Sequence, residues 1–121
     1  MNLNIDGQVI VKAITKDKET TNPDELIRLV ENWSLDKGLD KADSSKQFLK
    51  VTEEVGEVAS ALARSQEEEL KDAIGDVVVT LIILAQQNGL TLTECLSHAY
   101  NVIKHRTGRT VNGVFVKAED L

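Results

Sequence analysis

The sequence predicts an all-α protein, a single four-helix bundle with short extended segments at both ends. Apolar residues recur at helical spacing through most of the chain, start and stop signals mark the ends of these segments, and the breaks between them are short. Aromatic residues make up only 3% of the 121 residues. The core is therefore expected to consist of Leu, Ile, Val and Ala.

The chain is predicted to begin with an extended segment followed by a helix. Residues 8–14 are β-branched and partly alternating, which is typical of a strand or an extended arm. A helix should begin after Asn22, a capping residue, with Pro23 at the first helical position and Glu25 three residues after the cap. Gly38 is the expected stop. The apolar face of this helix consists of Leu26, Leu29, Val30 and Trp33.

Two longer helices are predicted in the middle of the chain. One runs from residue 44 or 45 to about residue 64, and the other from about residue 67 to residue 87, before the Asn88-Gly89 stop. Residues 77–85 are apolar on every face, so we expect them at the bundle centre or in a dimer interface. The buried stripe of the earlier helix is predicted to be Phe48, Val51, Val55, Val58 and Leu62.

A fourth helix is expected to begin at Thr91, where Glu94 completes a capping box, and to run to about Arg106. Cys95 lies in its apolar pattern and is predicted to be a buried structural thiol. The sequence is interpreted as one domain. Its parts are a helical core at about 22–109, an N-terminal arm at 1–21 and a C-terminal tail at 110–121.

The end of the chain is predicted to form a hairpin. Residues 108–117 contain the glycines and β-branched residues of such a turn, and residues 114–116 are a candidate partner for residues 9–11. That second pairing has no support beyond the matching β-branched composition.

The net charge and the composition argue against several classes of function. A net charge of −6 argues against stable nucleic-acid binding, which normally needs a basic face. The N-terminus lacks a signal-peptide pattern, and the longest strongly apolar stretch is too short to span a bilayer. A single cysteine fits a reducing compartment. We therefore expect a cytoplasmic protein without a membrane partner.

The most unusual feature is a set of carboxylates inside helices with apolar neighbours. Glu53, Glu54 and Glu57 share one region of a helix, and Asp72 and Asp76 are four residues apart on the next. Like charges at these spacings repel, and a bound cation removes the penalty. Two antiparallel helices can bring the two clusters face to face. Such an all-oxygen site suits Mg²⁺, with Mn²⁺ as the alternative.

A solvated acidic face is the competing interpretation. It fits Glu67, Glu68 and Glu69 best, because acidic residues at a helix start interact favourably with the helix dipole. For Glu54, Glu57 and Asp76 the two interpretations are evenly balanced on the residues alone.

Residues 50–58 contain Glu53-Glu54-Val55-Gly56-Glu57, which resembles the Glu-Glu-x-x-Glu signature of MazG-type nucleotide pyrophosphohydrolases. Residues 73–77 resemble the second signature of that family, Glu-x-x-Asp. The resemblance covers residues 23–109 and implies the all-alpha NTP pyrophosphatase fold. One position departs from the family, because Ala73 stands where the second signature has its glutamate. Asp72 is adjacent but points about 100° away around the helix.

The resemblance implies a Mg²⁺-dependent enzyme that cleaves nucleoside triphosphates to nucleoside monophosphate and pyrophosphate, with a house-cleaning role as one interpretation. It also implies a homodimer or homotetramer. Glu54, Glu57, Asp76 and Asp72 are then the expected metal ligands, and Glu53 either binds metal or orients the attacking water. The expected nucleotide-binding residues are Asn101, Lys104, Arg106, Arg109 and Lys50.

Several alternatives remain open. Arg106 and Arg109 fit equally well as cations at a helix C-terminus. Trp33 is either a core residue or a stacking platform for a base. Because of Ala73, the protein is alternatively a degenerate relative that binds nucleotide or metal without turnover. A helical interaction module with merely solubilising carboxylates is the third hypothesis.

Overall fold

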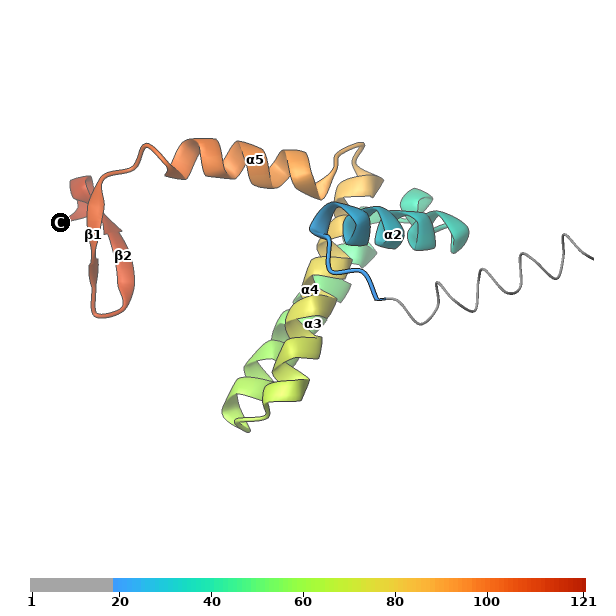
Figure 1. The fold of residues 1–121 in the computed structure, drawn as a ribbon, viewed down its shortest axis with the longest axis horizontal. Helices are drawn as coiled ribbons and strands as arrows, with labels where there is room; N and C mark the ends of the chain where they lie inside the picture. Colours follow the sequence, from blue (N-terminus) through green and yellow to red (C-terminus); the bar gives the residue numbers. More distant parts are fainter. Residues whose placement is uncertain (1–18) are drawn as a thin grey trace, which may run out of the picture.

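The computed structural model describes residues 19–121, which form helices and a small hairpin (Figure 1). In chain order the elements are α2 (Pro23–Asp36), η1 (Leu39–Lys41), α3 (Ser44–Ala63), α4 (Glu67–Gln87), α5 (Leu92–Ile103), β1 (Gly108–Val111), β2 (Val114–Lys117) and η2 (Ala118–Asp120). The predicted all-α class and its helices are confirmed. The predicted extended segment at residues 8–14, and its pairing with the tail, lie outside the described residues.

Helices α3 and α4 form an antiparallel pair (Figure 1). Only residues 64–66 join them, and Ser65 takes a left-handed conformation with φ of 55° to reverse the chain. A connection this short makes antiparallel neighbours of two helices. Ala61 and Ala73 are small and buried, at 3% and 5% exposure, which allows the two backbones to lie close together near the turn.

Helix α2 lies across the end of α4 that is farthest from this turn (Figure 1). Two glutamines of α4 donate to backbone carbonyls at this end. Gln86 Nε2 donates to Glu31 on α2 at 3.1 Å, and Gln87 Nε2 donates to Leu39 on η1 at 2.9 Å. The second half of α4 carries most of the core, as predicted for residues 77–85. Its buried residues are Thr80, Ile82, Ile83 and Ala85.

The predicted helix starts are confirmed by their capping contacts. Asn22 Oδ1 accepts from the backbone N–H of Glu25 at 3.1 Å. At the start of α5, Thr91 Oγ1 accepts from Glu94 N at 3.1 Å, and Glu94 Oε1 accepts from Thr91 N at 2.7 Å. These side chains satisfy backbone donors that the helices themselves leave free.

Helix α5 extends away from the α3–α4 pair and leads to the hairpin (Figure 1). The direction of the chain changes by 100° between α4 and α5. None of the residues of α5 is buried. Cys95 is exposed, so the prediction of a buried thiol is wrong for the single chain, because no other element among residues 19–121 covers this part of α5. The helix also ends at Ile103, earlier than predicted, because the chain then turns into β1.

The predicted apolar face of α3 is mostly uncovered. Val51 is buried, but Phe48, Val55 and Leu62 are 58%, 51% and 59% exposed. The prediction was wrong for these three because a neighbouring row of side chains, which includes Ala61, faces α4 instead. The predicted apolar face of α2 is also mostly uncovered, since three of its four residues are exposed. They are Leu26, Leu29 and Trp33.

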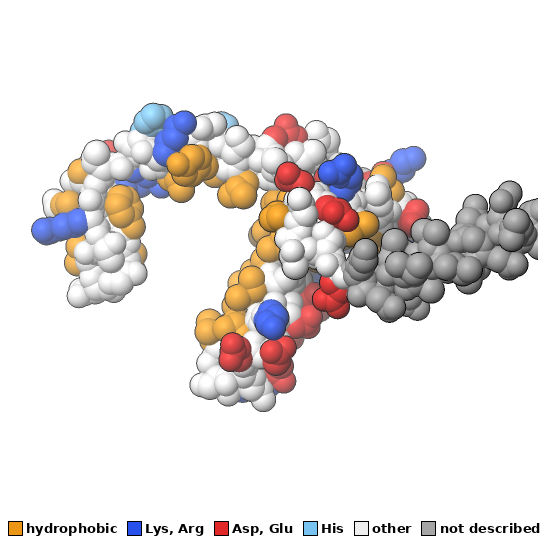
Figure 2. Space-filling view, in the orientation of Figure 1, with side chains coloured by type: hydrophobic (Ala, Val, Ile, Leu, Met, Phe, Trp, Pro, Cys, Tyr) orange, Lys and Arg blue, Asp and Glu red, His pale blue; other side chains and the backbone are white. Residues whose placement is uncertain are grey.

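Many of the exposed apolar side chains line one open space in the molecule. Figure 2 shows them on the helix pair and on α5 and the hairpin, where these parts face each other across an open space. On α5 they include Leu96 and Tyr100, at 66% and 57% exposure. Apolar surface of this extent on a single chain marks an interaction site.

The predicted hairpin is confirmed by residues 108–117. Strands β1 and β2 pair antiparallel, with Gly108 opposite Lys117 and Val111 opposite Val114. The connecting Asn112 and Gly113 have φ of 51° and 81°, which a two-residue hairpin turn requires.

Within residues 19–121 no single helix is long and apolar enough to cross a membrane. Helices α4 and α5 reach the required length and composition only when taken together, and they are bent by 100°.

Candidate active site

The carboxylates singled out in the sequence meet in one cavity between α3 and α4. Its volume is about 360 Å³. Helix α3 contributes Glu53, Glu54 and Glu57, and α4 contributes Asp72 and Asp76. The remaining lining residues are Ser60, Ala61, Glu69 and Ala73. The structure thus brings the two acidic clusters to one place, with small residues between them.

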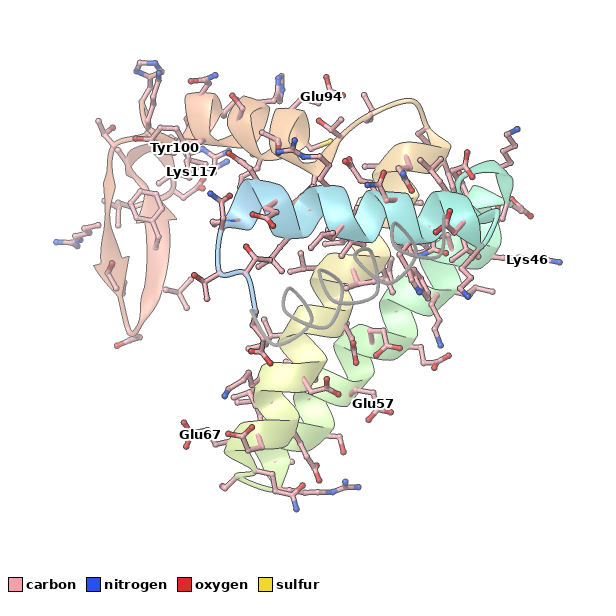
Figure 3. The ribbon with its side chains drawn as sticks, turned by 45° about the vertical axis from the view of Figure 1, so that its right-hand side comes forward. Lys46, Glu57, Glu67, Glu94, Tyr100 and Lys117 are labelled. Atoms are coloured by element: carbon pink, nitrogen blue, oxygen red, sulfur yellow. The ribbon has the colours of Figure 1, made fainter. Side chains whose placement is uncertain are left out.

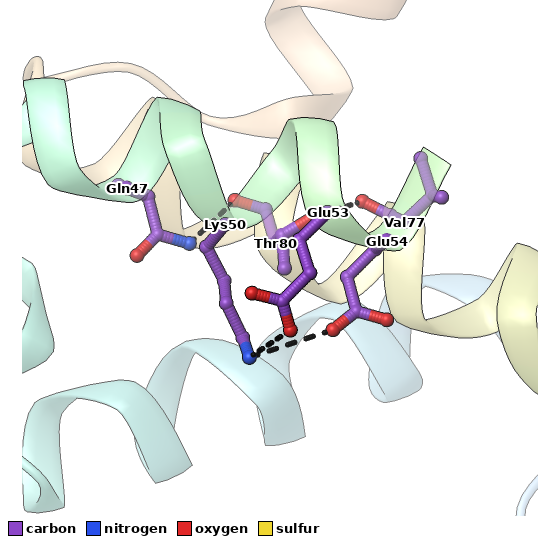
Figure 4. Close-up of polar contacts among 6 residues, drawn as sticks. All are labelled: Gln47, Lys50, Glu53, Glu54, Val77 and Thr80. Atoms are coloured by element: carbon purple, nitrogen blue, oxygen red, sulfur yellow. Dashed lines mark hydrogen bonds and ion pairs between the residues drawn. The ribbon is translucent and has the colours of Figure 1, made fainter. Parts of the chain in front are cut away.

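The adjacent carboxylates Glu53 and Glu54 have different surroundings. The Glu53 side chain is 61% exposed and that of Glu54 only 14%, because Glu54 is directed toward α4. Lys50 lies beside both, with Nζ 3.1 Å from Glu53 Oε1 and 3.6 Å from Glu54 Oε1 (Figure 4). The hydrogen bond and charge of Glu53, followed by the charge of Glu54, raise the pKa of Lys50. Lys50 therefore stays protonated at neutral pH and neutralises part of the cluster.

The carboxylates that line the acidic cavity do not converge on a single point. Among the described residues, no three His, Cys, Asp or Glu side chains converge closely enough to hold an ion as they stand. The donors are nevertheless all oxygen atoms around one small cavity, a set that suits a hard divalent cation.

A second cavity of about 510 Å³ adjoins the acidic one and shares Glu54 and Asp76 with it. Its apolar lining comes from η1, α2 and α4, and Lys46, Gln47 and Lys50 contribute polar groups from α3. Trp33, which is 50% exposed, is one of its lining residues. The apolar residues are Trp33, Leu39, Ala42, Val79 and Ile83.

Apart from Lys50, the residues predicted to bind nucleotide lie away from the two cavities. Asn101 is on α5, Lys104 directly follows this helix, and Arg109 is on β1; all three are exposed, and none lines either cavity. Lys104 Nζ lies over the Tyr100 ring, 5.9 Å from its centre. Arg106 lines a separate cavity of about 240 Å³ near the hairpin. The single chain therefore does not bring these four residues to the carboxylates.

Glu69 lines the acidic cavity although the sequence interpretation placed it in a solvated acidic face. Its spacing was an available signal, because Glu69, Ala73 and Asp76 follow the i, i+4, i+7 pattern of one helix face. Figure 3 shows that Glu57 and Glu67 point to opposite sides of the helix pair. Glu67 also lies outside the lining of this cavity. Only one residue of the acidic triplet belongs to the cavity.

Comparison with known proteins identifies the family. Residues 43–110 match the model of the MazG nucleotide pyrophosphohydrolase domain, which is more than half of the chain. The chain belongs to the MazG family. The matched part begins at the cap of α3 and ends in β1, so it includes the acidic cavity and all of α5.

A protein similar to this chain occurs in Haemophilus phage HP1 (strain HP1c1), where it is described as an uncharacterized 18.2 kDa protein in the rep-hol intergenic region. It is 42% identical over 65 residues, which are 53% of this chain and 40% of the phage protein. The chain thus spans well under half of this relative. No solved structure matches the chain.

Proposed function

We propose that this MazG-family protein is a Mg²⁺-dependent nucleoside triphosphate pyrophosphohydrolase. The observation that carries the proposal is the acidic cavity between α3 and α4, which adjoins a larger apolar cavity and shares Glu54 and Asp76 with it. A triphosphate needs a site that can hold metal ions, and a nucleoside needs an apolar site. Here the two kinds of site are side by side.

Glu54, Glu57 and Asp76 are the proposed metal ligands, with Asp72 as a fourth. The Glu54 side chain is much less exposed than that of Glu53, and its charge is only partly balanced by Lys50. Bound Mg²⁺ or Mn²⁺ supplies Lewis acidity and neutralises phosphate charge. Mg²⁺ fits best, because it takes only a few carboxylates from a protein and completes its shell with water and substrate phosphate.

Glu53 is the proposed general base. It is well exposed, so its carboxylate can reach a water molecule on the open side of the cavity. The water oxygen forms a bond to the α-phosphorus, its proton passes to the carboxylate, and the bond to the bridging oxygen of the β-phosphate breaks. The products are nucleoside monophosphate and pyrophosphate. Lys50, released from Glu53 and Glu54, is near enough to balance charge on the phosphates.

A second copy of the chain completes the proposed enzyme as a homodimer or homotetramer. The uncovered stripe on α3, with Val55 and Leu62, and the one on α5, with Leu96 and Tyr100, support this assembly. A partner's α5 laid against the helix pair would cover both. It would also move Asn101, Lys104, Arg106 and Arg109 toward a carboxylate cavity, where they serve as phosphate contacts.

Ala73 favours a second candidate function, binding of a nucleotide or metal without turnover. It lines the acidic cavity at the position where the family signature carries a glutamate. Glu69 offers a replacement carboxylate from one turn earlier, which supports the catalytic proposal over this alternative.

The deciding experiment measures pyrophosphate release from a panel of NTPs and dNTPs with Mg²⁺ or Mn²⁺. Wild type should release pyrophosphate, and Glu57→Gln should lower kcat by about 100-fold or more, since one carboxylate ligand is lost. Glu67→Gln is the matched control, because Glu67 lies outside the cavity. A wild type that gains thermal stability from Mg²⁺ and NTP without releasing pyrophosphate would establish the binding function instead.

A further inference from the structure

One amide in the apolar cavity has a fixed direction. Gln47 Nε2 on α3 donates to the backbone carbonyl of Thr80 on α4 at 3.1 Å (Figure 4). A carbonyl oxygen only accepts hydrogen bonds, so the amide nitrogen must face it and Gln47 Oε1 must point away from it. The Thr80 hydroxyl donates to the Val77 carbonyl at 2.8 Å and so does not compete for this contact. The cavity is left with a positioned hydrogen-bond acceptor.

The surroundings of this acceptor suit a flat aromatic ring with N–H groups on its edge. Trp33 and Ile83 line the cavity with apolar surface, and Glu54 and Asp76 connect it to the acidic cavity where phosphates would lie. Aromatic side chains stack on any nucleobase, whichever base it is. Discrimination between an unblocked and an alkylated base edge must then come from polar groups at the edge of the ring, and Gln47 provides one.

We propose that Gln47 Oε1 accepts a hydrogen bond from an edge N–H of the bound nucleobase, and that Gln47 is therefore a specificity-determining residue. The proposal rests on the proposed function, since the base belongs to its nucleotide substrate. Every unmodified base carries such an N–H group, so Gln47 selects for nucleotides with an unblocked edge. Nucleotides alkylated at these nitrogens lose this hydrogen bond and bind more weakly.

Fluorescence of Trp33, the single tryptophan of the chain, reports on the cavity without any need for turnover. The ligands are nucleoside monophosphates, which contain no anhydride bond to cleave: uridine monophosphate and its 3-methyl derivative, and adenosine monophosphate and its N6,N6-dimethyl derivative. Wild type should bind each unmodified nucleotide roughly 3- to 10-fold more tightly than its methylated counterpart, the range for one neutral hydrogen bond.

Two variants of Gln47 separate recognition from structure. Gln47→Lys keeps a donor for the Thr80 carbonyl and removes the acceptor, and Gln47→Met removes both. Both variants should bind methylated and unmethylated nucleotides with a ratio near one. Gln86→Met is the matched control, because Gln86 also bridges two helices through a backbone carbonyl but lies outside this cavity. Its ratio should equal that of wild type.

A wild type that binds both members of each pair equally would overturn the proposal, as would Gln47 variants that keep the wild-type ratio. Absence of any Trp33 response to nucleotides would overturn it as well. Failure of the hydrolysis assay with the ratio intact would remove the proposed activity and leave the role of Gln47 standing. Different measurements would therefore contradict the two proposals.

Discussion

The α3–α4 pair and the arm formed by α5, β1 and β2 both carry apolar residues, but they cover them to different extents. In α4, Ile82 and Ile83 are 2% and 4% exposed. In α5, Leu96 and Ile103 are 66% and 50% exposed. The helix pair is thus packed within the single chain, whereas the arm has hardly any packing there. The proposed chemistry thus lies on the packed pair, whereas the arm contributes surface to the proposed assembly.

This difference explains where the functional residues lie. The carboxylates need fixed positions, and they are on the two helices that hold each other in place. The basic residues Lys104 and Arg109 are on the arm, whose final position depends on what covers it. In the proposed enzyme, the single chain would therefore hold only the carboxylate half of the site, and assembly would supply the basic half.

Among the substitutions that test this difference between pair and arm, the largest effect is predicted for a charge on the arm. Leu96→Asp should convert the protein to a monomer and lower the rate of hydrolysis at least about 10-fold, since burying an unpaired charge in an apolar interface is strongly unfavourable. Light scattering during size-exclusion chromatography measures the assembly, and pyrophosphate release measures the rate.

His98→Asp is the control for this substitution. His98 is two residues along α5 and lies about 200° around the helix, on the opposite face. This variant should assemble normally. A wild type that is monomeric at all concentrations and fully active would contradict the assembly and make the arm dispensable.

A smaller effect is predicted for the helix pair. Glu69→Gln should weaken Mg²⁺ affinity about 10-fold, because it removes a carboxylate that lines the cavity beside Ala73. The Mg²⁺ dependence of the melting temperature provides the measurement. Glu67→Gln should leave this dependence unchanged, and equal effects of the two substitutions would mean that only the overall charge matters.

The smallest predicted effects concern the helix caps. Asn22→Ala should lower the free energy of unfolding by about 1 kcal/mol, since α2 packs on α4 and unfolds with it. Thr91→Ala removes an equivalent cap from α5. Its effect on the global denaturant midpoint should be smaller, and increased amide hydrogen exchange should be confined to the arm. Equal midpoint shifts would show that the arm and the pair unfold as one unit.

The same contrast limits what sequence can predict. Helix starts were predicted closely because capping is local: Asn22 and Thr91 contact residues only three positions away. The meeting of Glu54 with Asp76 was also within reach, because it needs only two adjacent helices joined by a short turn.

The covered face of each helix was harder to predict, because it depends on a neighbour that helical spacing does not identify. Phe48 and Leu62 have the spacing of a core stripe, yet they face outward in the single chain. Cys95 was misplaced for the same reason. The role of Glu69 was missed because it depends on the residues of α3 across the cavity.

The ion pairs of Lys50 also bear on which cations the site can take. Its ammonium group lies 3.1 Å from Glu53 and 3.6 Å from Glu54, so an arriving ion competes with a charge that is already there. Sodium or potassium brings only the single charge that the lysine already supplies, whereas a divalent ion brings twice as much. Abundant monovalent salts therefore gain little from entering. In the proposed metal site, the lysine would favour divalent over monovalent ions by charge alone, in addition to any selection by ionic radius or coordination number.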